Sequence, residues 1–236
     1  MCGRYYRQSD KQRIAEAFHL GNVDDFPLEA APSYNIAPTT MQPVIRNSRD
    51  NDERQIVAMR WGMVPFFAKS FDDFKGISTI NAKAETLQTN RMWRRPFQRH
   101  RCIVPADGYY EWAKLGPKTK QPYAFALRDG AMIGMAAVWD AWKNPVTNEW
   151  LQSYSIITTD PNELTATVHN RMPVILKLSD YDRWLDREHT HAPPVDLLRP
   201  FDADKMTAHT VDPRVGNVRN DEPSLCTAWQ CPPNSA

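Results

Sequence analysis

The sequence is poor in cysteine and in net charge and has no long apolar run, and each of these shortages restricts what the protein can be. Four cysteines in 236 residues are too few for a secreted domain built on disulfides. Basic residues exceed acidic ones by only one, so nucleic-acid binding would need a local basic patch. No apolar run approaches the ~18 residues of a membrane span, and the first ten residues lack a signal-peptide core. We therefore expect a cytoplasmic protein without membrane contact.

Proline is abundant, and its 19 residues mark loops and strand ends. Short turns such as Arg128-Asp129-Gly130 join runs of aromatic and β-branched residues, which favours antiparallel pairing. We predict an α+β fold with a curved, mostly antiparallel, barrel-like sheet and a few short helices. The runs expected to form strands are 42–46, 55–63, 101–113, 121–127, 132–139 and 151–159.

The helices are expected to be short and few. Ser9, Asp160 and Ser179 stand at positions typical of helix caps, each ahead of a short amphipathic stretch. Residues 1–221 should form a single domain, because no linker or repeat interrupts them. Residues 222–236 are polar and rich in proline, so we expect a loosely ordered tail. A monomer is expected.

Cys2 is the first residue that could carry chemistry. Cysteine is small, so Met1 should be removed and Cys2 should become the N-terminus. An α-amine has a reference pKa of ~8, against ~10.4 for lysine, so a sizeable fraction is neutral and nucleophilic near pH 7. Such an amine attacks aldehydes, and the neighbouring thiol can then close a thiazolidine ring. The alternative is that Cys2 is only a small residue at an unconstrained terminus.

Glu111 and His169 are candidates for proton transfer. Glu111 stands between large aromatic residues, and strand alternation puts it on one face with Tyr109. Burial of that face would raise its pKa and suit it to acid–base work. His169 lies in a loop with Arg171 two residues on, where it could move protons beside a phosphate contact. The alternatives are a solvated carboxylate and a histidine with a packing role.

Two segments have the composition of single-strand nucleic-acid binders. Residues 90–101 interleave five arginines with aromatic rings, and residues 61–67 end in a proline turn with Phe66 and Phe67. A basic groove with rings on which bases stack is the usual single-strand site. The alternatives are a solvated charged helix and core packing.

Asn81 offers a donor and an acceptor that could orient a sugar or carbonyl oxygen, although it could equally cap a helix. A metal site is not expected, because the available histidines and cysteines lack suitable spacing. The sets considered are His189 with His191, and His209 with Cys226 and Cys231. No cofactor is expected.

The motifs together resemble one family, the SOS response-associated peptidases (SRAP). The resemblance runs from residue 2 to about residue 220. It rests on ordered blocks at residues 1–4, 34–38, 61–62, 80–86, 106–112, 169–173 and 215–220. Members of this family form covalent crosslinks to abasic sites in single-stranded DNA. The resemblance therefore implies a DNA-damage protein that shields abasic sites, with single-stranded DNA as its partner, in the nucleoid of a bacterium or the nucleus of a eukaryote.

The resemblance also implies roles for individual residues. Cys2 would be the nucleophile through both its amine and its thiol. Asn81 would position it, and Glu111 and His169 would transfer protons during ring formation and reversal. A peptidase activity releasing Met1 and a lyase-like reversal of the crosslink belong to the same expectation. The residues implied in DNA binding are Arg4, Asn35, Pro38, Trp61, Phe66, Phe67, Lys83 and Arg171.

Two departures from the family pattern affect binding rather than chemistry. Lys83 stands where the family often has arginine, and Phe66 and Phe67 stand where tryptophan is common. Two other hypotheses remain open. One is an N-terminal-nucleophile amidohydrolase, although the chain contains no Asn-Gly pair of the kind that feeds the oxyanion hole of such enzymes. The other is a non-covalent reader of modified or single-stranded DNA.

Overall fold

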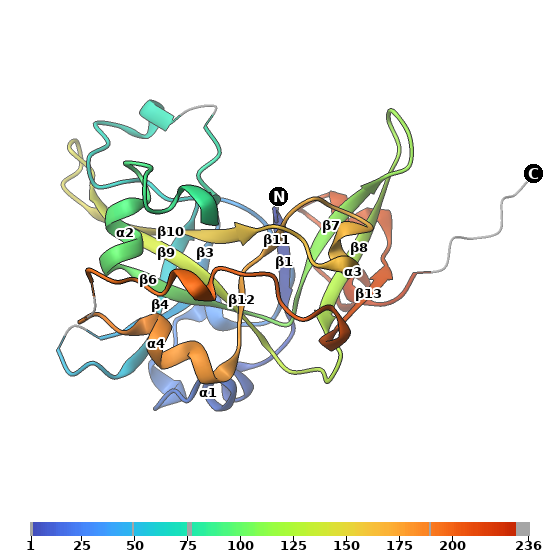
Figure 1. Cartoon of the computed structure of the whole chain (residues 1–236), viewed down its shortest axis with the longest axis horizontal. Helices are drawn as coiled ribbons and strands as arrows, with labels where there is room; N and C mark the ends of the chain where they lie inside the picture. Colours follow the sequence, from blue (N-terminus) through green and yellow to red (C-terminus); the bar gives the residue numbers. More distant parts are fainter. Residues whose placement is uncertain (1, 49, 75–76, 189, 230–236) are drawn as a thin grey trace, which may run out of the picture.

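The chain forms two β-sheets, a smaller one of five strands and a larger one that closes into a barrel. The computed structural model describes residues 2–48, 50–74, 77–188 and 190–229. Within these ranges it has thirteen strands and four short α-helices (Figure 1). The helices are α1 (Lys11–Phe18), α2 (Arg94–Arg99), α3 (Glu163–Ala166) and α4 (Tyr181–Leu185). Short 3-10 turns lie at Val23–Asp25, Leu28–Ala30, Phe71–Phe74, Ala84–Thr86, Leu178–Asp180, Val195–Leu197, Ala203–Lys205, Pro213–Gly216 and Pro223–Cys226.

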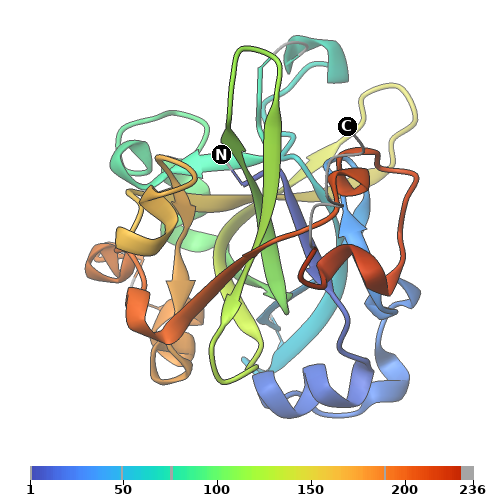
Figure 2. The ribbon, with the colours of Figure 1, turned by 90° about the vertical axis from the view of Figure 1, so that its right-hand side faces the viewer.

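The smaller sheet carries the N-terminal strand. Its five strands pair antiparallel throughout, and β1 lies between β7 and β2. Figure 2 faces this sheet, with the hairpin of β7 and β8 in front and β1 beside it. In sheet order the strands are β13 (Met206–Thr210), β8 (Lys120–Leu127), β7 (Gly108–Lys114), β1 (Arg4–Arg7) and β2 (Ser33–Ile36).

The larger sheet closes on itself. β10 pairs with both β4 and β9, so the order β10-β4-β3-β6-β9 returns to β10 and forms a small barrel. Among the described residues, the parallel pairings are those of β10 with β4 and of β10 with β5, whereas β4 pairs antiparallel with β3. The strands are β3 (Met41–Asn47), β4 (Arg54–Trp61), β5 (Asn81–Lys83), β6 (Arg101–Ala106), β9 (Ile133–Lys143), β10 (Trp150–Thr159), β11 (Met172–Pro173) and β12 (Ile175–Leu176).

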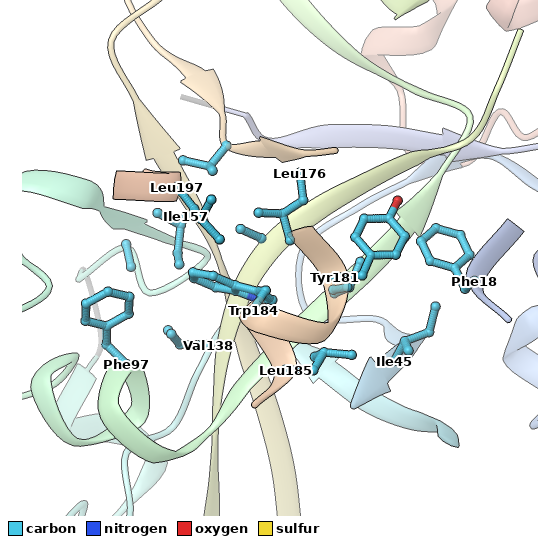
Figure 3. Close-up of a cluster of buried hydrophobic side chains, with 14 of the residues drawn as sticks. Phe18, Ile45, Phe97, Val138, Ile157, Leu176, Tyr181, Trp184, Leu185 and Leu197 are labelled. Atoms are coloured by element: carbon cyan, nitrogen blue, oxygen red, sulfur yellow. The ribbon is translucent and has the colours of Figure 1, made fainter. Parts of the chain in front are cut away.

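The barrel strands feed two apolar clusters because successive side chains point to opposite faces. One cluster packs under α1, α2 and α4, where Phe18, Phe97 and Trp184 cover the barrel (Figure 3). The other continues beneath the five-stranded sheet and includes Cys2 and Tyr109. Neighbours in sequence divide between the two clusters at Ile45 and Val44, Val138 and Ala137, and Ile157 and Ile156.

The predicted fold class is confirmed, and each of the six predicted strand runs contains strand residues. The run 101–113 is divided at Asp107 between β6 and β7, which belong to different sheets. The predicted helix caps are wrong. Asp10 caps α1, because the Ser9 hydroxyl donates to Asp107 instead, and Asn162 rather than Asp160 caps α3. Ser179 lies inside a 3-10 turn that precedes α4. Six short strands lie outside the predicted runs, because none is long enough to show an alternating apolar pattern; they are β1, β2, β5, β11, β12 and β13.

The expected C-terminal tail is packed over its first part. Leu225 is fully buried, and the backbone N–H of Trp229 donates to the carbonyl of Thr210 at 2.9 Å. The chain is therefore held against β13 as far as residue 229. Residues 230–236, the rest of the expected tail, lie outside the described residues. No helix in the described ranges is both long and apolar enough to cross a membrane.

Gly108 begins the strand that carries Glu111, and its position leaves no room for a side chain. A Cβ there would collide with the carbonyl of Phe125 and the ring of Tyr6. We expect Gly108→Ala to lower the free energy of unfolding in urea by about 3 kcal/mol, because backbone cannot move aside cheaply. Gly116→Ala in the same hairpin has open space around it and should change stability by less than about 0.5 kcal/mol. Equal stability of the two variants would contradict this packing.

Candidate active site

The N-terminal segment is buried beside Glu111 because β1 is an inner strand. β1 pairs antiparallel with β7, and Arg4 lies opposite Tyr110. Continuing that register brings the residues before Arg4 alongside Glu111, the next residue of β7. Cys2 is fully buried, and the negative charge of Glu111 acts on its thiol. The alternative of an unconstrained terminus is therefore wrong for Cys2.

Asn81 fixes the main chain of Cys2. Its side-chain Nδ2 donates to the Cys2 carbonyl at 2.8 Å, and only 7% of the residue is exposed. Asn81 begins β5, which lies parallel to β10 with Asn81 opposite Ile156, so the helix-cap alternative is wrong. The indole of Trp61 holds the preceding carbonyl, that of Ile80, at 2.9 Å. The Oδ1 atom of Asn81 has no hydrogen-bond partner among the described residues.

Glu111 is a buried carboxyl close to a histidine. It is 3% exposed, and burial raises its pKa to about 7. Its Oε1 atom lies 3.9 Å from Nδ1 of His169. Near neutral pH the carboxyl is divided between its two protonation states, so it can both give and take a proton.

His169 lies in the loop that follows α3 and is close to Glu111 on β7. Its Nδ1 lies 3.1 Å from the backbone nitrogen of Arg171 and 3.3 Å from the carbonyl oxygen of the same residue, so this nitrogen has a partner in either neutral tautomer. Burial lowers its pKa, so the neutral form dominates at pH 7. His169 is therefore prepared to accept a proton.

The thiol of Cys2 is not a standing thiolate. Burial, followed by the charge of Glu111, raises the pKa of Cys2 far above that of an exposed thiol. Its Sγ lies 3.9 Å from the Arg4 carbonyl. A reaction of this sulfur must therefore move its proton as the new bond forms, and the neighbouring Glu111 and His169 are suited to that transfer.

Two of the residues predicted to bind DNA hold the protein together. Arg4 donates to Oδ1 of Asn35 at 2.6 Å and to the carbonyl of Val215 at 2.8 Å. The amide nitrogen of Asn35 donates to the carbonyls of Val215, Asn217 and Asn220. Together they fasten residues 215–220 across β1 and β2. These contacts give a structural role to the motif block at residues 215–220, which had no predicted role.

Trp61 differs from its predicted role because it is fully buried and presents no ring face to solvent. Phe66 is 52% exposed, and Pro38 and Phe67 are partly exposed. Lys83 is exposed at the end of β5. Of the three predicted aromatic residues, Trp61 is therefore part of the core, and Phe66 and Phe67 have rings that solvent can reach.

Arg171 already has carboxylate partners. Its guanidinium contacts Glu85 through two hydrogen bonds, of 2.6 and 3.0 Å, and reaches Asp160 at 3.1 Å and the carbonyl of Thr158 at 2.6 Å. Sequence analysis assigned no role to Glu85. Its position two residues after Lys83 in the block 80–86 was the available signal.

Metal ligation has no support in the described part of the chain. No group of three histidine, cysteine, aspartate or glutamate residues there could hold an ion. His189 and Cys231, which were considered for such a site, lie outside the described residues, as does Met1.

Comparison with known proteins agrees with the motifs. A family model described as SOS response associated peptidase (SRAP) matches residues 1–218. The chain belongs to the SRAP family. The abasic site processing protein YoqW of Bacillus subtilis is 39% identical over 228 residues, covering 95% of this SRAP chain and 98% of that protein. The abasic site processing protein HMCES of Gallus gallus is 33% identical over 220 residues, covering 81% of this chain and 65% of that protein.

Solved structures share the SRAP fold. The crystal structure of a protein from Bacteroides thetaiotaomicron matches with a TM-score of 0.83 at 28% identity, over 97% of this chain and all of that one. A protein from Bordetella bronchiseptica matches with a TM-score of 0.76 at 28% identity, over 89% of this chain and all of that one.

The raised pKa of Glu111 predicts how stability changes with pH. A carboxyl whose pKa rises from 4.5 to about 7 on folding destabilises the folded state progressively as pH rises through that window. At about 1.4 kcal/mol for each pH unit, the full effect is on the order of 3 kcal/mol. Glu111→Gln should therefore match the wild type near pH 4.5 and become more stable than it above pH 7.

Urea unfolding of both proteins between pH 4.5 and 8 measures this difference. Glu16→Gln, on the exposed side of α1, is the matched control, and its offset from the wild type should stay flat across the range. If the stability difference between Glu111→Gln and the wild type is also independent of pH, burial does not raise the pKa of the Glu111 carboxyl.

Proposed function

We propose that this SRAP protein recognises abasic sites in single-stranded DNA and shields them by a covalent thiazolidine formed through Cys2. One observation carries the proposal: Asn81 holds the main chain of Cys2 at 2.8 Å beside the proton-transfer pair Glu111 and His169, themselves 3.9 Å apart. The printed names of the relatives support the substrate class. The proposal takes Cys2 as the N-terminus after removal of Met1.

The reaction needs no cofactor and no change of oxidation state. The amine of Cys2 adds to the aldehyde carbon of the ring-opened abasic sugar, giving a carbinolamine. Loss of water then gives an imine. The sulfur of Cys2 adds to the same carbon, its proton passes to the nitrogen, and a five-membered thiazolidine results.

Each proton step has a group suited to it. Glu111, with a pKa raised to about 7 by burial, can donate a proton to the departing hydroxyl and take one from the attacking amine. His169, whose pKa is lowered by burial, is neutral and can accept the thiol proton and return it to nitrogen. Because the buried thiol keeps its proton until attack, sulfur addition is coupled to that transfer.

Exposure supports the proposed DNA-binding assignments. Lys83 is exposed at the end of β5 and can contact a phosphate directly. Arg171 would exchange a carboxylate for a phosphate, and Pro38, Phe66 and Phe67 would line the strand. Arg4, Asn35 and Trp61 would act from beneath this surface, by fixing the segments that form it.

Peptidase and lyase chemistry would use the same groups. Release of Met1 would free the amine of Cys2, and reversal of the crosslink would regenerate the aldehyde through protonation by Glu111. Whether Met1 leaves by the protein's own action is measured by intact mass in a Cys2→Ala variant, because a retained methionine there assigns the step to the thiol.

Two alternatives make different predictions. A glutamine amidohydrolase would release ammonia from glutamine, which a coupled glutaminase assay detects. A non-covalent reader would bind abasic DNA reversibly and with a steep salt dependence that survives loss of Cys2.

The central prediction is that Cys2 is required for a stable crosslink. Wild-type protein incubated with single-stranded DNA carrying one abasic site should give a band that survives denaturation. Cys2→Ala and Cys2→Ser, prepared so that intact mass shows Met1 to be absent, have a free amine at residue 2 but no thiol, so they should give a band only when borohydride reduces the imine. The reason is that neither can close a sulfur ring.

Cys226→Ser is the matched control, since Cys226 is a partly exposed cysteine outside the site. It should crosslink like the wild type. A denaturation-resistant band of wild-type intensity from Cys2→Ala without reductant would refute thiazolidine formation, and absence of any band from the wild type would refute covalent capture.

A second prediction concerns Asn81. Asn81→Ala removes the side chain that fixes the Cys2 carbonyl, and misplacement of a nucleophile by about 1 Å costs up to about a hundredfold in rate. We expect the initial crosslinking rate to fall by tenfold to a hundredfold. Asn22→Ala truncates an exposed asparagine that caps the 3-10 turn Val23–Asp25, outside the segments assigned to the site, and should leave the rate unchanged. Wild-type rates in Asn81→Ala would contradict a positioning role.

A further inference from the structure

A contact between two buried hydroxyl groups joins the elements that carry Glu111 and His169. The hydroxyl oxygen of Tyr109 lies 3.2 Å from Oγ1 of Thr165, and both residues are fully buried. Tyr109 belongs to β7 and Thr165 to α3, which lies next to β7 and β8 in Figure 1. Among the described residues, this is the hydrogen bond that links α3 to β7. We call Tyr109 and Thr165 the hydroxyl clamp.

Each residue of the clamp is closely connected to one of the two groups suited to proton transfer. Tyr109 precedes Glu111 by two positions on one strand, so both side chains point to the same face of β7. Thr165 precedes His169 by about one helical turn, and its carbonyl accepts the backbone N–H of His169 at 2.9 Å. The clamp therefore bridges the same two elements as the 3.9 Å approach of Glu111 Oε1 to His169 Nδ1.

Other hydrogen bonds of this segment lead away from β7. Asn162, which caps α3, donates to the carbonyl of Phe201 at 2.8 Å. Arg171, two residues after His169, contacts Glu85 at 2.6 Å. Under the proposed function Arg171 would exchange Glu85 for a phosphate, so this contact would be lost when DNA binds. The clamp requires no such exchange and would keep the histidine loop beside β7 in both states.

The clamp is neutral and its aromatic half is held in place. Burial raises the pKa of the Tyr109 hydroxyl far above its ordinary range, so this group keeps its proton while its neighbours exchange theirs. The Tyr109 ring stacks on Phe125 with 5.0 Å between the ring centres and 10° between their planes. A buried hydroxyl without a partner is unfavourable, so the interior favours the state in which Tyr109 and Thr165 are in contact.

We propose that Tyr109 and Thr165 are positioning residues whose hydroxyl contact sets the separation between Glu111 and His169. The inference rests on the proposed function, because it takes Glu111 and His169 as the groups that transfer protons. It adds that their spacing is fixed by a contact outside the pair. Both residues of the clamp act through the elements that they join, and neither hydroxyl takes part in a proton transfer.

Titration of His169 by NMR, without DNA, tests the position of the histidine loop. Burial lowers the pKa of His169, and the charged groups of the described residues that face it are Glu111 and Lys114, both on β7. Tyr109→Phe and Thr165→Val each remove one hydroxyl and keep the shape of the side chain. The loop should then move away from β7, so the pKa of His169 should rise toward that of an exposed imidazole. Thr165→Ser keeps a hydroxyl and should restore the wild-type pKa. Loss of the signal in His169→Gln assigns it.

The double variant Tyr109→Phe with Thr165→Val separates positioning from packing. A single change leaves one buried hydroxyl without its partner, whereas the double change removes both, so its stability in urea should be no lower than that of the single variants. Its crosslinking rate at saturating abasic DNA should nevertheless stay about tenfold below that of the wild type, because the spacing is lost. Its affinity for DNA with tetrahydrofuran, which has no aldehyde, in place of the abasic sugar should not change. A clamp with a purely structural role would recover the rate together with the stability.

Tyr110→Phe is the matched control on the same strand. Tyr110 is also fully buried, and its hydroxyl donates to the carbonyl of Tyr34 at 2.8 Å on the opposite face of β7. This variant loses a buried hydroxyl of the same kind without touching α3. It should keep the wild-type pKa of His169 and the wild-type crosslinking rate.

The outcomes separate this inference from the proposed function. An unchanged pKa of His169 in the double variant would overturn the clamp, and so would a double variant that crosslinks as fast as the wild type. A raised pKa together with slower crosslinking supports it. The titration uses no DNA, so it decides the position of the loop whether or not the protein forms a crosslink. A wild type that forms no crosslink would overturn the covalent capture alone.

Discussion

The hydrogen bond from Asn81 to the Cys2 carbonyl is the contact on which the site depends. It ties the first residues of the chain to β5, and β5 is held by parallel pairing to β10 of the closed barrel. A chain terminus ordinarily has few constraints and frays. Here β1 is an inner strand of the five-stranded sheet, so the terminus inherits the rigidity of two sheets. Cys2, although only the second residue of the chain, is thereby held as firmly as a residue within a strand.

Burial favours the uncharged form of three titratable groups of the site, those of Cys2, Glu111 and His169. It raises the pKa of the Cys2 thiol and of Glu111, and it lowers the pKa of His169. In each case the neutral form is favoured, because a charged group loses its hydration in the interior. Under the proposed function, the site would hold protons on the groups that supply them and would keep the imidazole able to accept one. This distribution suits condensation with an aldehyde, which proceeds through neutral amine and loss of water.

Short-range patterns predicted the sheet but not the long-range pairings that assemble the site. Alternation and β-branched composition identified the strand runs, and alternation also put Glu111 on one face with buried Tyr109. Residue pairs such as Asn81 with Cys2 are 79 positions apart, and no local signal reports such a contact. The motif blocks supplied that information through family resemblance. The predicted cap at Ser9 failed for a similar long-range reason, because its hydroxyl donates to Asp107, 98 positions away.

Several basic residues already have partners within the protein, and this affects how the site would select its substrate. Arg171 makes a bidentate ion pair with Glu85, and the guanidinium groups of Arg91 and Arg95 lie over aromatic rings. Exchanging one anion for another at Arg171 yields little net Coulomb energy, and a chain with a net charge of +1 attracts DNA weakly at long range. Under the proposed function, non-covalent affinity for intact strands would stay modest. An intact nucleotide offers no aldehyde and dissociates, whereas an abasic nucleotide reacts before it leaves. Selectivity would then arise at the bond-forming step at Cys2.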